Sequence, residues 1–244
     1  MSPAIVAIVA NGGKIMFRVV VALALVAIAL PVEAKQRRVV EPLAEEIINN
    51  NHVVAVEISI NPLAAEKMAK FEEKAAEKRT AASLPPVDAA APLSTRPSED
   101  EYATLPFQRM FPLVIEDVTR EWGLTGGRPI KLRVSIDTLK TANAAMAILL
   151  APSADQLAGM VEVVDPQTNE GLGSFYVDVL NGHSGWGGML MRGGGVREKL
   201  AEEFGLESAR VLAGSTKKDL KARKKQREKA AKERAKAQTT GAGN

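Results

Sequence analysis

The sequence predicts an α+β fold: a small antiparallel sheet with helices packed on one face, plus a peripheral helix and a basic C-terminal tail. Two segments, 107–122 and 196–212, carry apolar side chains at helical spacing. Residues 131–139 alternate between apolar and polar side chains, as a half-buried strand does. Two further apolar runs, 157–164 and 172–180, are separated by a short connection, which indicates an antiparallel hairpin.

The hairpin connection is rich in Asp, Pro, Asn and Gly, the residues that form turns. Its first residue, Asp165, is expected to bond its own backbone within the turn. A further strand is predicted at 53–60, where β-branched residues dominate. Residues 141–151 fit either a helix or a buried strand, because a short apolar run is compatible with both.

Local signals mark where the helices begin and which side chains they bury. The pair Asn61-Pro62 supplies a helix cap followed by proline at the first helical position, so a helix is expected from there to about Thr80. Few of its residues are large and apolar, which indicates a largely solvated helix. In the next helix Pro112 indicates the regular start, and the spacing places Trp122 in the core.

The N-terminal residues have the layout of a secretory signal peptide. Lys14 and Arg18 precede the apolar run Val19–Leu30, and small residues then stand before a cleavage site between Ala34 and Lys35. This run is short for a membrane span, which needs about 20 apolar residues, although an uncleaved anchor stays an alternative. The expected location is therefore the periplasm or the secreted fraction. Either Met1 or Met16 is compatible with the true start.

Composition divides the chain into five segments. The region 83–104 contains several prolines among Ala, Ser and Thr, which is typical of an extended linker. The predicted segments are a signal peptide (1–34), a strand–helix segment (35–82), the linker (83–104), an α+β domain (105–214) and a basic tail (215–244).

Charge and cysteine content limit the classes of partner and cofactor. The chain contains no cysteine, so neither disulfides nor thiolate metal sites are available. Residues 35–214 carry a net charge of −6, whereas residues 215–244 carry +8. Export argues against nucleic acid as a partner of the tail. The tail is interpreted either as a disordered solubilising extension or as a segment that contacts an envelope protein or an anionic envelope polymer, with a membrane surface as a further candidate.

The glycine-rich stretch 182–195 is where an enzyme active site would have to lie. Ser184 stands in a pattern close to the nucleophile motif G-x-S-x-G, but Trp186 occupies the final position and the following helix is too distant. Glycines 193–195 could present free N–H groups to an anion at a helix start, beside Arg192 and Arg197. Surface charge is the favoured interpretation of both arginines.

Other polar residues are assigned structural roles. His52 and His183 are the only histidines and lie far apart, with no recognisable metal-ligand spacing. Asp178 shares a strand face with Tyr176, as solvated residues commonly do. The sequence therefore predicts no catalytic, cofactor-binding or metal-ligating residue and no cofactor.

The segment from Leu132 to Phe204 resembles a group of uncharacterised bacterial envelope proteins. It shares with them a strand, a small-residue segment at 142–145, and a strand that ends in Asp-x-x-Thr at 165–168. A second strand, a glycine-rich stretch and a closing helix complete the pattern, with Asn169 at a position where the group usually has glycine. The resemblance implies an envelope location and an α+β fold, and it implies no activity.

Two hypotheses about function remain open at this stage. The first is an exported, non-catalytic cell-envelope protein that binds or scaffolds. The second is a periplasmic hydrolase or ligand-binding enzyme that uses the loop 182–195.

Overall fold

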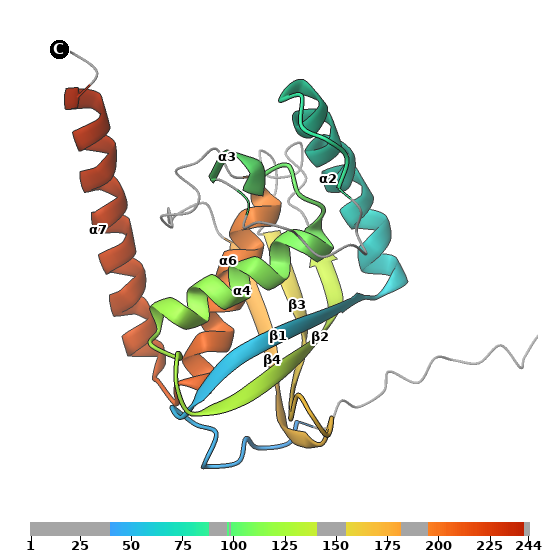
Figure 1. Cartoon of the computed structure of the whole chain (residues 1–244), viewed down its shortest axis with the longest axis vertical. Helices are drawn as coiled ribbons and strands as arrows, with labels where there is room; N and C mark the ends of the chain where they lie inside the picture. Colours follow the sequence, from blue (N-terminus) through green and yellow to red (C-terminus); the bar gives the residue numbers. More distant parts are fainter. Residues whose placement is uncertain (1–39, 88–96, 98, 141–154, 182–194, 242–244) are drawn as a thin grey trace, which may run out of the picture. The chain divides into compact units, whose positions relative to one another are not determined.

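The computed structural model describes residues 40–87, 97, 99–140, 155–181 and 195–241 (Figure 1). Their elements follow the order β1 (Asn51–Ile60), α2 (Pro62–Ala81), α3 (Glu99–Tyr102), α4 (Phe107–Glu121), β2 (Arg128–Lys140), β3 (Asp155–Val164), β4 (Gly171–Asn181), α6 (Val196–Leu212) and α7 (Lys217–Gly241). The α+β class is confirmed. Across these ranges, no helix combines the length and the apolar character that crossing a bilayer requires.

The four strands form one sheet in the order β1-β2-β3-β4. β2, β3 and β4 pair antiparallel, as predicted, and the hairpin between β3 and β4 is confirmed. β1, however, pairs parallel with β2, so the sheet is mixed and the prediction of a wholly antiparallel sheet was wrong. The cause is the connection: α2, α3 and α4 lie between the two strands, and a long crossover of this kind returns the chain in the same direction.

The linker therefore does not separate two structural units. β1 precedes it and β2 follows it, yet their residues are hydrogen-bonded neighbours in one sheet, for example Glu57 beside Arg133. All described residues belong to one compact unit, to which both the predicted segment 35–82 and the predicted domain 105–214 contribute. Residues Glu99–Tyr102 of the predicted linker form the helix α3, and composition carries no information about which strands pair across the linker.

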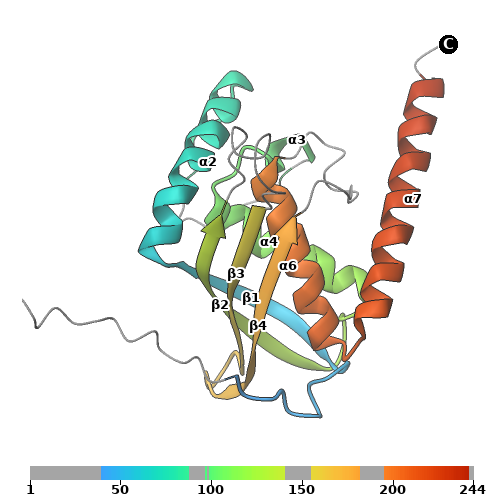
Figure 2. The same ribbon diagram turned by 180° about the vertical axis from the view of Figure 1, so that it is seen from behind.

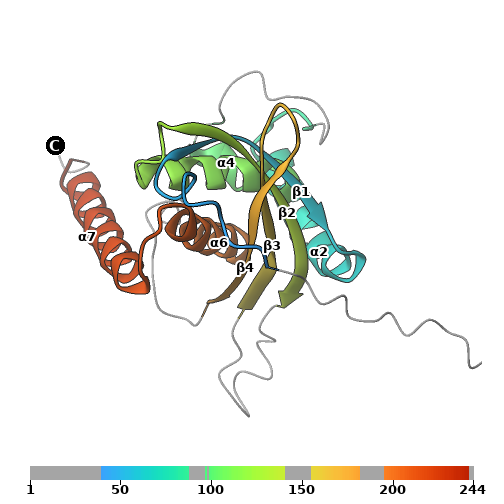
Figure 3. The same ribbon diagram turned by 90° about the horizontal axis from the view of Figure 1, so that it is seen from below.

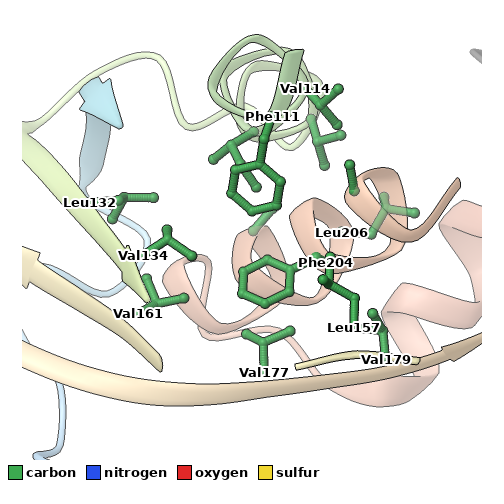
Figure 4. Packing of buried hydrophobic residues seen from close by; sticks show 14 of the residues in the cluster. Phe111, Val114, Leu132, Val134, Leu157, Val161, Val177, Val179, Phe204 and Leu206 are labelled. Carbon is green, nitrogen blue, oxygen red and sulfur yellow. The ribbon is translucent and has the colours of Figure 1, made fainter. Parts of the chain in front are cut away.

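The core lies between the sheet and the helices α4 and α6 (Figures 2 and 3). Alternate residues of β2, among them Leu132 and Val134, point into it, as the sequence alternation predicted. Phe111 of α4 and Phe204 of α6 meet there edge-on with ring centroids 5.3 Å apart (Figure 4). Trp122 is 6% exposed, which confirms its predicted place in the core.

α4 begins at Phe107, five residues before the start that Pro112 indicated. Pro112 lies inside the helix, where it removes one backbone hydrogen bond. Burial of Phe107 and Phe111 in the first turns stabilises the helix despite that loss. A side chain of another helix also caps the N-terminus of α4, because the Phe107 N–H donates to the Glu72 carboxylate of α2 at 2.9 Å.

α2 and α7 confirm the local predictions made for them. The Asn61 side chain caps α2 by accepting from the Leu63 N–H at 3.0 Å, and Pro62 opens the helix. α2 buries only Ala64, Met68 and Ala75, in keeping with a largely solvated helix. The tail, predicted to be helix-prone, forms α7. The predicted signal peptide, residues 141–151 and most of the glycine-rich stretch lie outside the described residues.

Candidate functional site

The sheet has one face that is built from strand side chains alone. Helices α4 and α6 cover the opposite face (Figure 3). The apolar half of each alternating strand is buried beneath them, so the polar half lies on the face that they leave uncovered. We call this surface the outer sheet face. Its principal side chains are those of Glu57, Ser59, Lys131, Arg133, Ser135, Met160, Glu162, Tyr176 and Asp178.

Glu57 of β1 is the centre of an ion-pair cluster on the outer sheet face. Its carboxylate binds the Lys131 ammonium at 3.0 Å and the Arg133 guanidinium at 3.3 Å. Both cations also donate to the Asn169 side-chain oxygen, at 2.6 and 2.8 Å. The hydrogen bond from Lys131, with a further contribution from Arg133, lowers the pKa of Glu57.

Asn169 lies in the β3–β4 hairpin with a φ of 60°, a left-handed conformation that asparagine tolerates. That geometry brings its side chain back over β2. The cluster therefore connects the β3–β4 hairpin to the strands β1 and β2.

A shallow hollow of about 370 Å³ lies beside this cluster. Its rim carries Glu57 and Arg133, and Glu162 stands opposite Arg133 in the β2–β3 register. Ser135 and Met160, which are also register partners, line it between these charges. The volume falls within the range of small ligand sites, about 300–1,000 Å³.

Tyr176 of β4 lies beside Met160, which lines the hollow. It is the cross-strand partner of Met160, and 44% of its surface is exposed. An aromatic ring exposed on a sheet face presents a flat apolar contact with a hydroxyl at its edge. Charges of both signs, a thioether and an exposed aromatic ring thus gather on the outer sheet face, across four neighbouring strands.

A second hollow, of about 390 Å³, lies along α2 and the first residues after it. Its polar groups already bind one another or the backbone. Arg79 donates to the Thr104 hydroxyl at 3.0 Å, and Glu72 accepts the N–H that opens α4. These contacts explain the polar residues as parts of the α2–α4 junction.

The alternative of an anion site at the start of α6, which the sequence left open, is not supported by the geometry around Gly195. The Gly195 N–H donates to the Glu198 carboxylate at 2.8 Å, so the helix start is capped by its own side chain. Its φ of −95° is an extended conformation that any residue adopts. Glu198 therefore occupies the place that an external anion would need.

Arg197 is buried, which corrects its interpretation as a surface charge. Its side chain is 2% exposed and lies 2.9 Å from Glu198 and 3.5 Å from Glu72. A guanidinium held by two carboxylates is compensated, so burial is tolerated. Its long-range partner comes from α2, and no local pattern around residue 197 indicates it.

The structure describes two of the remaining residues that the sequence singled out, Asp165 and His52. Asp165 accepts from the backbone N–H groups of Gln167 and Thr168 at 2.9 and 3.0 Å, as predicted, and these bonds with that of Arg128 lower its pKa to about 2. His52 contacts the Gly127 carbonyl at 3.1 Å. Across the described ranges no group of three or more metal-ligating side chains occurs. Arg192, His183 and Ser184 lie outside those ranges.

Sequence reasoning missed the Glu57 cluster. Alternation placed Arg133 on the polar side of its strand, but Glu57 lies 76 residues away in a segment assigned to another unit. Only the parallel pairing of β1 with β2 brings them together. The available signal was Glu57 itself, the one acidic residue of the strand Asn51–Ile60.

Comparison with known proteins adds little beyond these observations. No protein-family model matches the chain, and no curated protein matches it. Among solved structures it is similar to the PelC dodecamer from Paraburkholderia phytofirmans, with a TM-score of 0.33, 11% identity and coverage of 73% of this chain and 96% of that one.

Two other solved structures are similar at lower scores. One is a predicted lipoprotein from Caulobacter crescentus CB15 (TM-score 0.25, 14% identity, 42% of this chain and 80% of that one). The other is a predicted neuraminyllactose-binding hemagglutinin homologue from Helicobacter pylori (TM-score 0.22, 13% identity, 75% and 92%). At these TM-scores the similarities carry no argument about activity, partner or assembly.

Proposed function

We propose that this protein is an exported, non-catalytic component of the bacterial cell envelope that binds or scaffolds a partner protein through the outer sheet face. The export part rests on the signal-peptide pattern at 1–34, in which a basic start is followed by a short apolar run. The binding part rests on one structural observation. The hollow at Arg133, Ser135 and Met160 is lined by strand side chains only.

The chemistry of this face favours a protein as the partner. Carboxylates at Glu57, Glu162 and Asp178 balance the cations at Lys131 and Arg133, so the surface lacks the excess positive charge that a polyanion requires. Tyrosine, methionine and arginine are also the residue types enriched at protein interfaces. A partner surface with alternating charges would complement the face and gain specificity from it.

A photocrosslinking amino acid at Ser135, inside the hollow, tests the proposal in intact cells. The matched control carries the same group at Lys74, an exposed residue of α2. We expect a discrete adduct with one envelope protein from position 135 and none from position 74.

The adduct must also depend on the side chains of the face. Tyr176→Ala removes the exposed ring and Arg133→Glu reverses one charge, so each should reduce the adduct at least about tenfold, while Lys70→Glu on α2 should not. Folding is checked by the melting temperature of each purified variant. Equal labelling from both positions, or an adduct that survives Tyr176→Ala and Arg133→Glu, would contradict the proposal.

A further inference from the structure

Helix α7 carries two sets of cations on opposite faces. The first set lies on the same side of the helix as the buried Leu220 and contacts the rest of the folded protein, which we call the body; its members are Arg223, Lys224 and Arg227. Arg227 lies 2.7 Å from the Glu202 carboxylate and 3.3 Å from that of Glu121. We call this set the docking face.

The other contacts of the docking face hold the root of the helix in place. Arg223 lies over the Trp122 ring, 4.4 Å from its centroid, and donates to the Glu121 carbonyl at 3.0 Å. Lys224 forms an ion pair with Glu203 of α6. Figures 1 and 2 show the first turns of α7 next to the ends of α4 and α6.

The second set consists of lysines alone and forms a straight stripe. Successive members are separated by three, four, four and three residues, a spacing that keeps them on one side of a helix with 3.6 residues per turn. At 100° per residue this side is opposite to the docking face. All five side chains are exposed, and the stripe extends for about 21 Å along the axis; its members are Lys218, Lys221, Lys225, Lys229 and Lys232.

The acidic residues of α7 leave the stripe positive. Asp219 is engaged at the helix start, where it accepts from the Thr216 N–H at 2.9 Å. Glu233 lies 4.0 Å from Lys229, but both side chains are mostly exposed, so this pair neutralises little. Glu228 lies between the two faces. The body occupies the docking side only, and the lysine stripe is therefore accessible to a flat surface.

We propose that the lysine stripe binds the head-group phosphates of an anionic phospholipid bilayer, so that α7 lies along the membrane surface with the body behind it. The lysine ammonium is a compact charge suited to phosphate. The stripe contains no large apolar side chain, so α7 would stay at the head-group level instead of inserting into the acyl region. This inference does not rest on a partner at the outer sheet face, because it uses residues on another element.

The expected strength follows from the number of lysines. Each one near an anionic surface contributes about fivefold in affinity, and the attraction falls off over about 8 Å at physiological salt. Removing four of the five should therefore weaken binding at least about hundredfold. It should leave the docking face and the fold intact.

Sedimentation with vesicles of phosphatidylglycerol and phosphatidylcholine tests this, with pure phosphatidylcholine vesicles as the uncharged arm. The chain is compared with a variant in which Lys221, Lys225, Lys229 and Lys232 are changed to Gln, which keeps the helix propensity. The control variant changes four exposed lysines of α2 to Gln and removes the same charge; these are Lys67, Lys70, Lys74 and Lys78.

We expect the unaltered chain and the α2 variant to bind the charged vesicles and the α7 variant not to bind them. Added salt should release the unaltered chain and the α2 variant from these vesicles. Helix content measured by circular dichroism confirms that α7 persists in both variants. Equal loss in the two variants would show that net charge alone is measured and would overturn the proposal. Binding to linear polyphosphate without binding to the charged vesicles would overturn it as well.

Discussion

Arg227→Gln should destabilise the protein more than Glu202→Gln does, although the two side chains form one ion pair. The Glu202 side chain is 3% exposed, whereas that of Arg227 is 16% exposed. Burial raises the pKa of Glu202, and the attraction of Arg227 compensates only in part. Folding thus shifts the protonation equilibrium of this carboxyl group towards its neutral form.

The asymmetry in free energy follows from what each substitution leaves behind. Glu202→Gln places a neutral group of similar shape at the buried site, and Arg227 keeps its contact with Glu121, so a change within about 1 kcal/mol is expected. Arg227→Gln leaves the buried carboxylate near two other acids, Glu121 and Glu203, with Lys224 as its remaining cation. Breaking a fully buried pair costs about 3–5 kcal/mol.

Glu202 can relieve part of that cost by taking up a proton. We therefore expect Arg227→Gln to lower the free energy of unfolding by about 2 kcal/mol. For a chain of this size, this corresponds to a fall of about 4–8 °C in melting temperature.

The effect should also depend on pH with a definite sign. The pKa of Glu202 is raised on folding, so its contribution to stability is fully present below the unfolded pKa and is lost as pH rises through the folded pKa. Removing Arg227 raises the folded pKa further. The deficit of Arg227→Gln relative to the unaltered chain should therefore be largest near neutral pH and shrink towards about pH 4.5.

Urea denaturation of both variants at the two pH values measures this. A larger loss for Glu202→Gln than for Arg227→Gln, or a deficit that does not change with pH, would refute the reasoning.

Three further outcomes are expected. Phe204→Ala should lower the free energy of unfolding by about 3–5 kcal/mol in urea denaturation, because it opens a cavity in the middle of the core. Gly159→Ala should cost about 1–3 kcal/mol by the same measurement, since an added Cβ would overlap the Ser135 backbone oxygen on the neighbouring strand; a variant as stable as the parent would show that β2 can shift. Mass spectrometry of the protein from the envelope should find an N-terminus at Lys35, and a retained apolar run would instead identify an anchor.

Features that depend on adjacent residues were predictable from the sequence. The Asn61 cap and the Asp165 turn each use hydrogen bonds within three residues, so their chemistry is visible in the local pattern. The place of Trp122 in the core follows from helical spacing alone. Periodicity reports which face of an element is apolar, and this was sufficient for the α+β class.

Features that depend on distant residues were not predictable. The start of α4 at Phe107 depends on a carboxylate from α2, and the burial of Arg197 depends on the same side chain, Glu72. The cluster on the outer sheet face needs the register of β1 on β2. The spacing of the α7 cations indicates that they lie on two faces of the helix. Only the contacts with the acidic residues at α4 and α6 show which of the two faces binds the body.

The parallel pairing of β1 with β2 has a consequence for how the chain can be divided. A cut in the proline-rich linker would give two fragments that each hold part of one sheet, so the pieces should remain associated without a peptide bond between them. The C-terminal fragment alone would expose the long β2 as an edge strand, with unpaired backbone groups beside an apolar face. Such a fragment should aggregate when produced alone and become soluble when residues 40–87 are co-expressed, as expected of complementing halves of a single folding unit.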